Sequence, residues 1–209
     1  RLPVFIGNHD MGRFATFVSQ KYPSASDEEK LARIKLAHAM MFFLRGVPVV
    51  YAGDEQGFNG DGKDQAARED MFASLVASYN DNDLVGTTAT TATANFNRRH
   101  PLYRFIAEIG KIRGEHEALR RGALVVREAE SDGGVFAVSR LAPAGGEYLV
   151  AVNASAAPRT LNISVDPRSR MWKPVYGACE KNSSAPGSVR VSAPAFGFAI
   201  CKSNEWEPA

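Results

Sequence analysis

The sequence lacks a long apolar run, an excess of charge of one sign and a cluster of cysteines. Its longest apolar candidate, residues 37–50, is interrupted by His38, Arg45, Gly46 and Pro48, so we expect no membrane-spanning helix and no membrane partner. The 25 Lys plus Arg and 23 Asp plus Glu nearly cancel to a net charge of +2. This balance excludes the strongly basic surface of a polyanion-binding protein, so we expect no nucleic acid partner.

The only two cysteines are Cys179 and Cys201. They have neither the close spacing nor the neighbouring histidine of a zinc site, and we predict no metal site in this chain. A disulfide would fit an exported protein, and two small buried thiols would fit any compartment. Both alternatives stay open from the sequence.

The first half of the chain has the pattern of an α/β fold. Residues 2–6 and 47–52 are apolar without alternation, which predicts two buried parallel strands. Ser26 and Glu29 have the spacing of a capping box and predict a helix start, and Gly46 before Pro48 predicts its end. Strand, helix and strand make one crossover unit. Residues 53–97 form a long excursion with a possible helical turn around 71–79.

The second half changes to an all-β pattern. One helix is expected from Pro101 to Gly122. Short alternating segments follow at residues 124–129, 135–141, 148–153, 160–165 and 196–201. The predicted fold class is therefore α/β plus all-β, with an α/β domain at 1–122 and an antiparallel β-sandwich at 123–209. Two parallel strands leave open edges, so more chain or another molecule must complete the first domain.

Asn8-His9-Asp10 follows the first predicted strand, where α/β folds place their chemistry. An isolated His-Asp pair is more commonly structural than catalytic, so position alone does not decide its role.

Longer segments resemble the α-amylase family of glycoside hydrolases. Residues 5–13, Phe-Ile-Gly-Asn-His-Asp-Met-Gly-Arg, resemble the strand-seven motif of that family, and residues 46–57 resemble its strand-eight signature. Residues 64–72 are similar to the acidic-plus-arginine stretch that often follows strand eight, and residues 102–122 to the last barrel helix. The resemblance implies the C-terminal fragment of a (β/α)8 TIM barrel followed by the β-sandwich. The missing N-terminal barrel half of the same protein is then an expected partner.

The resemblance also implies a retaining enzyme that hydrolyses α-1,4-glucosidic bonds in an α-glucan or maltooligosaccharide. Asp10 corresponds to the carboxylate that stabilises the transition state, and His9 to a histidine that hydrogen-bonds sugar hydroxyls. Asn8 and Arg13 are further substrate-binding candidates. The nucleophile and general acid of the family would precede residue 1, so we expect this chain alone to be inactive.

Several residues allow two interpretations. Asn8 could orient backbone or sugar, and Arg13 could pair with a local carboxylate, line the cleft or face solvent. Asp54 and Glu55 are expected to support a loop and not to form the catalytic dyad. Tyr51 could face a sugar or fill the core.

Aromatic and histidine residues outside the motif have similar alternatives. Trp172, Tyr176 and Trp206 could form a starch-binding surface, although large aromatics more often fill a sandwich interior. His38 is expected in the core. His100 and His116 are expected at the surface.

Two functions from other classes compete with the enzyme: a non-catalytic amylase-fold scaffold, and a free-standing glucan-binding β-sandwich. No cofactor is expected within this chain, and calcium is possible in the full-length parent. The chain begins at Arg1 without an initiator Met, inside a predicted strand, and we expect it to be the back part of a larger protein. Extracellular or periplasmic localisation is preferred, with a cytoplasmic one possible. Two alternatives stay open: whether the enzyme hydrolyses or transfers glycosyl groups, and whether it prefers α-1,4 or α-1,6 bonds.

Overall fold

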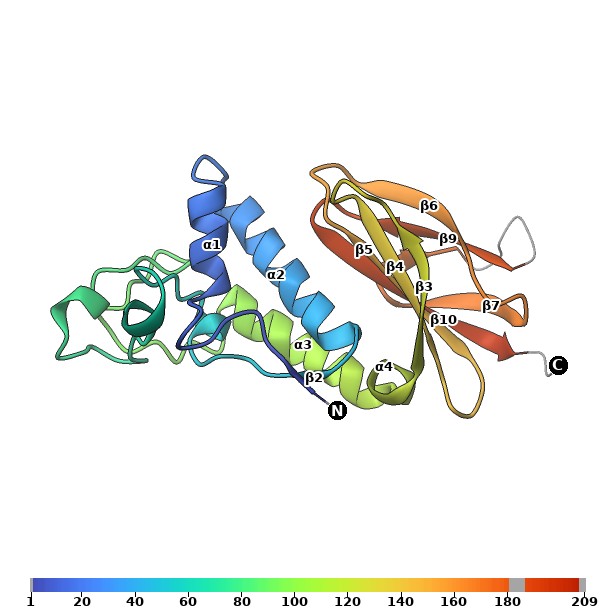
Figure 1. The fold of residues 1–209 in the computed structure, drawn as a ribbon, viewed down its shortest axis with the longest axis horizontal. Helices are drawn as coiled ribbons and strands as arrows, with labels where there is room; N and C mark the ends of the chain where they lie inside the picture. Colours follow the sequence, from blue (N-terminus) through green and yellow to red (C-terminus); the bar gives the residue numbers. More distant parts are fainter. Residues whose placement is uncertain (1, 181–186, 207–209) are drawn as a thin grey trace. The chain divides into compact units, whose positions relative to one another are not determined.

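The structure is a computed structural model that describes residues 2–180 and 187–206 (Figure 1). The chain divides into two compact units. One comprises residues 1–42 and 46–110, and the other residues 43–45 and 111–209. Each unit is described by itself below.

The first unit contains the predicted parallel strand pair. Strand β1 (Pro3–Val4) pairs in parallel with β2 (Val47–Pro48). Both strands are shorter than the predicted 2–6 and 47–52, and the prediction that they are buried is wrong for several side chains. The exposed ones are Leu2, Phe5, Val47 and Val49. The reason is physical: a strand pair buries its apolar residues only when further strands and helices cover it.

The first unit contains α1 (Phe14–Lys21) and most of α2 (Asp27–Phe43) and α3 (Pro101–Glu115). The predicted cap of α2 is present, because Ser26 Oγ accepts a hydrogen bond from the Glu29 N–H at 3.2 Å. A hydrophobic cluster joins the helices to the loop that follows β2. Its buried members are Ala15, Val18, Ile34, Val85 and Leu102.

The predicted helix over 101–122 is interrupted. Helix α3 ends at Glu115, and α4 (Glu117–Arg121) starts after His116, whose backbone is extended.

The excursion between β2 and α3 contains three short 3-10 turns, η1 (Asp54–Gln56), η2 (Asp64–Ala67) and η3 (Ala77–Tyr79). The turn η3 overlaps the helical turn predicted around residues 71–79.

The second unit contains an antiparallel β-sandwich. A five-stranded sheet has the order β3-β4-β5-β10-β7, and a three-stranded sheet has the order β6-β9-β8. The strands are β3 (Ala123–Ala129), β4 (Val135–Leu141), β5 (Glu147–Asn153), β6 (Arg159–Ser164), β7 (Ser169–Tyr176), β8 (Ala178–Cys179), β9 (Ser188–Ala193) and β10 (Gly197–Trp206). The five predicted strands are all present, and β7, β8 and β9 were not predicted.

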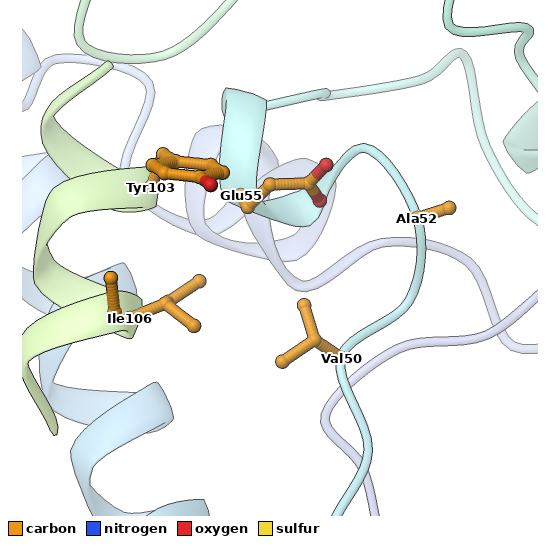
Figure 2. A pocket seen from close by; sticks show the side chains of 6 residues that line it. Val50, Ala52, Glu55, Tyr103 and Ile106 are labelled. Carbon is orange, nitrogen blue, oxygen red and sulfur yellow. The ribbon is translucent and has the colours of Figure 1, made fainter. Parts of the chain in front are cut away.

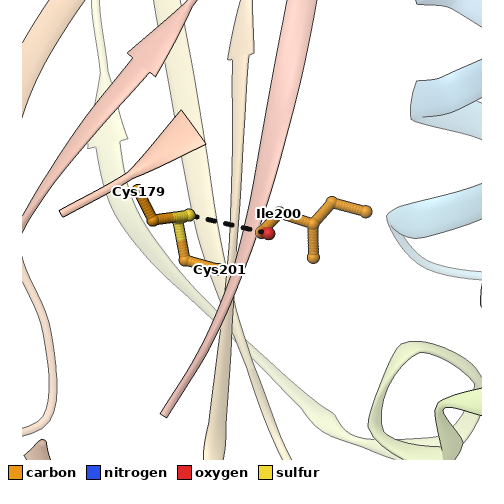
Figure 3. The surroundings of a disulfide bond; sticks show 3 residues. All are labelled: Cys179, Ile200 and Cys201. Atoms are coloured by element: carbon orange, nitrogen blue, oxygen red, sulfur yellow. Dashed lines mark hydrogen bonds between the residues drawn. A yellow bond between two sulfur atoms is a disulfide. The ribbon is translucent and has the colours of Figure 1, made fainter. Parts of the chain in front are cut away.

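The sandwich core lies between the two sheets. Its buried members include Leu149, Ile163, Trp172 and Val189. Cys179 and Cys201 form a disulfide that joins β8 of one sheet to β10 of the other (Figure 3). The disulfide alternative therefore holds in this structure, and the alternative with two free thiols is wrong.

Candidate active site

The residues 8–12 form a tight turn, here named the His9–Asp10 turn. The backbones of Asn8 and Gly12 hydrogen-bond each other in both directions, at 3.2 and 3.1 Å. Asn8 Oδ1 accepts hydrogen bonds from the N–H groups of Asp10 (2.9 Å) and Met11 (2.7 Å). The Asn8 side chain thus orients backbone, as one of its two alternatives expected. Sugar binding by Asn8 stays a prediction.

His9 and Asp10 project into solvent from this turn. Their side chains are 59% and 67% exposed, and His9 Nε2 lies 3.4 Å from Asp10 Oδ1. An exposed imidazole beside an exposed carboxylate offers a donor and two acceptor oxygens to a polar ligand. The structure therefore leaves both predicted residues accessible.

The loop after β2 returns to the same turn. Asp64 donates its backbone N–H to the Asp10 carbonyl at 3.2 Å, and Arg68 Nε donates to the His9 carbonyl at 3.4 Å. Arg68 Nη2 also lies 3.6 Å from Asp10 Oδ1 and forms an ion pair with Asp64. In the sequence, residues 64–72 stand out only because they are similar to the acidic-plus-arginine stretch that often follows strand eight in the α-amylase family. The spacing of four residues between Asp64 and Arg68 was the available signal for their pairing.

Arg13, directly after the turn, is fully buried. Its Nε donates to Glu69 Oε2 at 2.6 Å, and its Nη1 donates to Asp54 Oδ1 at 3.0 Å and to the Ala52 carbonyl at 3.0 Å. Pairing with a local carboxylate is thus confirmed, and the solvent-facing alternative is wrong. Substrate binding by Arg13 stays a prediction, and a side chain without exposed surface favours a supporting role.

Two aromatic rings contact the same guanidinium. Arg13 Cζ lies 4.5 Å from the ring centroid of Tyr51 and 5.0 Å from that of Phe58. The Tyr51 hydroxyl donates to the Ala67 carbonyl at 3.1 Å. The name Arg13 cluster is used below for Arg13, Tyr51, Asp54, Phe58 and Glu69. Tyr51 is half-buried and does not belong to the core, and a contact of its ring with sugar stays a prediction.

Burial sets the electrostatics of the Arg13 cluster. It raises the pKa of Asp54 from 3.8 to about 6, although the neighbouring Arg13 charge acts in the opposite direction. Burial also raises the pKa of Glu69, and Arg13 again opposes the shift. Glu55 Oε2 accepts the Gly53 N–H at 2.9 Å. Asp54 and Glu55 therefore support the loop, as predicted, and do not form an exposed carboxylate pair.

A cavity of about 430 Å³ lies elsewhere in the first unit (Figure 2). Val50, Tyr103 and Ile106 line it with mostly apolar surface, and Glu55 is a further lining residue. None of the four predicted site residues lines this cavity. It is not the predicted sugar site.

The aromatic residues of the sandwich do not form a common surface. Trp172 is 2% exposed and belongs to the core, so a starch-binding role for it is wrong. Tyr176 stacks on Phe198 with centroids 4.4 Å apart, and Arg168 lies over the Trp206 ring at 4.3 Å. Protein groups therefore already occupy ring surface that a sugar would need.

The other three histidines differ in how deeply they are buried. His38 is in the core, as predicted, with Nδ1 2.9 Å from the Ile34 carbonyl oxygen. The prediction that His100 lies at the surface is wrong: it is buried, and its Nδ1 accepts the Leu102 N–H at 3.2 Å. His116 is half-buried, 3.2 Å from the Tyr148 hydroxyl.

Over residues 2–180 and 187–206, no group of three or more His, Cys, Asp or Glu side chains is arranged to hold a metal ion. Within those same ranges, no helix has the length and apolar character needed to cross a membrane.

Comparison with known proteins gives a family match. Residues 2–122 match the family described as alpha amylase, catalytic domain. The chain is 40% identical over 200 residues to an alpha-amylase of Streptomyces lividans, and this match covers 95% of the chain and 22% of that protein. The chain therefore spans about a fifth of the length of this relative.

Solved structures show the same fold. An Anoxybacillus alpha-amylase has a TM-score of 0.72 at 18% identity, covering 100% of this chain and 39% of its own. AmyP, solved in complex with maltose, has a TM-score of 0.69 at 18% identity, covering 99% of this chain and 41% of its own. The likeness confirms the predicted fold class, a fragment of a (β/α)8 barrel followed by a β domain. The predicted boundary after Gly122 stays a prediction, because the family match ends there but the compact units divide after Gly110.

Proposed function

Because the chain belongs to the α-amylase family of glycoside hydrolases, we propose that it supplies part of the active site of a retaining enzyme that hydrolyses α-1,4-glucosidic bonds. The observation that carries this proposal is the exposed His9–Asp10 pair on a turn that is hydrogen-bonded from several sides. A maltooligosaccharide is the proposed substrate, and the maltose complex of AmyP supports this class of ligand.

In this proposal Asp10 acts as an ionised carboxylate. It binds ring hydroxyls of the sugar at the cleavage point and stabilises the positive charge that develops there. His9 donates a hydrogen bond to a hydroxyl of the same sugar. Hydrogen bonds that strengthen in the transition state lower the barrier by several kcal/mol.

The nucleophile and the general acid are proposed to come from chain that precedes these residues in the complete barrel. The 209-residue chain alone is then inactive, because no glycosyl-enzyme intermediate forms without a nucleophile. The exposed apolar side chains of Leu2, Phe5, Val47 and Val49 support a barrel half as the missing partner. A completed sheet would cover such residues.

A chimera tests the proposal. The barrel segment that precedes the match in the Streptomyces lividans alpha-amylase is joined to this chain, and starch hydrolysis is measured. We expect turnover by the chimera and none by the 209-residue chain. Asp10→Asn in the chimera should lower kcat by about a thousandfold with little change in KM, because the lost interaction is made mainly in the transition state. His9→Ala should lower kcat/KM by about tenfold to a hundredfold.

Asp132→Asn is the matched control, because Asp132 is exposed in the turn between β3 and β4. It should leave kcat unchanged. Full activity of the Asp10→Asn chimera, or turnover by the purified 209-residue chain, would contradict the proposal.

Calcium, if the complete enzyme uses it, is proposed to bind outside this chain. Among the described residues, no group of three or more His, Cys, Asp or Glu side chains is arranged to hold a metal ion. Export is proposed as well, supported by the Cys179–Cys201 disulfide. Thiol labelling of protein made with and without an export signal tests it: free thiols in the exported form would contradict export as the source of the bridge.

A further inference from the structure

Arg13 connects the His9–Asp10 turn to helix α1. It is the N-terminal flanking residue of α1 and follows Gly12, whose backbone pairs with Asn8. Whatever holds the Arg13 side chain therefore also holds the downstream end of the turn.

Two separate parts of the following loop hold this side chain. The Ala52 carbonyl and Asp54 come from the segment directly after β2, and Glu69 comes from the segment after η2. The bonds use Nε and Nη1, two different nitrogens of the planar guanidinium fork. A lysine ammonium is a point charge and cannot reproduce this forked geometry.

The same loop also contacts the turn on its exposed side. The Asp64 N–H bonds the Asp10 carbonyl, and Arg68 Nε bonds the His9 carbonyl. Residues 52–69 therefore hold Arg13 through buried groups at both of their ends, and they contact the turn itself through Asp64 and Arg68.

A buried ion cluster is a weak source of stability. Removing charges from water costs free energy, and apolar residues of similar volume often replace buried ion pairs without loss. Arg13, Asp54 and Glu69 are all buried, and Arg13 has no exposed surface. Their place beside an exposed functional turn suggests a purpose other than net stability.

We propose that Arg13, through its forked contacts to Asp54 and Glu69, is a positioning residue that holds the His9–Asp10 turn against the loop after β2. Only the catalytic effect of this role rests on the proposed function. In that function, a fixed turn keeps the Asp10 carboxylate in position against the sugar. A displacement of about 1 Å in such a group can cost about a hundredfold in rate.

Amide hydrogen exchange, resolved by NMR on the full 209-residue chain, tests the proposal without any sugar. Its result is therefore independent of whether the chain acts on glucans. The reporting amides are Asn8, Gly12 and Asp64, which bond within or onto the turn. The reference amides are His38 in α2 and Ile109 in α3.

Arg13→Met should accelerate exchange at the reporting amides by about tenfold or more, with less than about a twofold change at the reference amides. The NMR signals of the His9 imidazole should shift as well, because its distance to Asp10 is no longer fixed. Arg13→Lys should rescue only part of the protection. Asp54→Asn keeps an oxygen acceptor for Arg13 and should give a smaller selective effect, about threefold.

Arg104→Met is the matched control, because Arg104 is an exposed arginine on α3. It should change neither set of amides. Equal acceleration at reporting and reference amides would show a merely structural role and overturn the proposal. Unchanged reporting amides, or complete rescue by Arg13→Lys, would overturn it too. If Arg13→Met does not fold, Asp54→Asn and Glu69→Gln decide by the same criterion.

Discussion

Similar apolar side chains are buried in the β-sandwich and exposed in the strand pair of the barrel fragment. In the sandwich, Leu149 and Ile163 are no more than 1% exposed. In the two-stranded sheet of the first unit, Leu2 is 81% exposed and Val47 44% exposed. Antiparallel strands close a core with their sequence neighbours, whereas barrel strands are buried only when the whole barrel closes. The sandwich is therefore complete in itself, and the barrel fragment is not.

Each unit also contains a buried carboxylate paired with arginine. Glu147 is buried in the sandwich and accepts hydrogen bonds from Arg127 at 2.9 Å and Ser169 Oγ at 2.6 Å. Its partners hold strands of the sandwich together. Arg13 instead lies next to an exposed turn. The same chemistry serves the fold in one unit and the candidate site in the other.

The largest expected effect follows from separating the two regions. Residues 111–209 should fold alone and unfold cooperatively on heating, because their core lies between their own sheets. Residues 1–110 should unfold at a lower temperature than residues 111–209, because their strand pair stays uncovered. Circular dichroism and thermal melts check this, with the whole chain as control. A melting temperature of residues 1–110 equal to or above that of residues 111–209 would break the comparison.

Trp172→Ala should destabilise the sandwich by about 3–5 kcal/mol, because it removes a large side chain from a closed core. Trp206→Ala, at a partly exposed tryptophan, should cost less than about 1 kcal/mol. Urea unfolding followed by circular dichroism measures both. Equal costs at the two positions would show that the core is not where the structure places it.

Removing the disulfide should destabilise the protein slightly less than Trp172→Ala does. Cys179 and Cys201 are 22 residues apart, and closing a loop of that length stabilises a fold by about 3.5 kcal/mol in the chain-entropy description. The double variant Cys179→Ala, Cys201→Ala should therefore melt at lower temperature than the oxidised protein. Reductant should lower the melting point of the parent and leave the double variant unchanged. An effect of reductant on the double variant would point to another cause.

The smallest expected effect is the pH dependence of Asp54. Its pKa in the folded protein is about 6, above its ordinary 3.8, so the folded state binds this proton more tightly. The resulting stability is fully present below pH 3.8 and is lost as pH rises through about 6, by at most about 3 kcal/mol. The charged neighbours that act on this group are Arg13, Glu55 and Glu69.

Asp54→Asn should remove that dependence, because an amide does not titrate in this range. Free energies of unfolding measured between pH 4 and pH 7 check it, with Asp132→Asn as the control that keeps the parent profile. An identical pH profile for parent and Asp54→Asn would mean that another group titrates in this window.

Local patterns predicted the sandwich strands well and the barrel strands less well. The alternation over 135–141 gives the bounds of β4 as the structure has them. Strand β7 was not predicted because Pro174 interrupts its pattern, and β7 lies at the edge of its sheet, where proline is tolerated. The lengths of β1 and β2 depend on hydrogen-bond partners that no local pattern encodes.

The candidate site divides in the same way. A motif was enough to select Asn8, His9 and Asp10, because they are adjacent in the chain. The partner of Arg13 was not predictable, because Glu69 is 56 residues away. Nor was the contact of Arg68 with the turn, 59 residues from His9.

The sequence by itself determined the fold class through local periodicity, and it indicated the family and the His9–Asp10 segment through motifs that resemble those of the α-amylase family. Only the tertiary structure decided that Arg13 is buried and paired with Asp54 and Glu69, that Trp172 belongs to the core and that Cys179 bonds Cys201. Burial and pairing between distant residues are consequences of packing, and packing is a property of the folded chain as a whole.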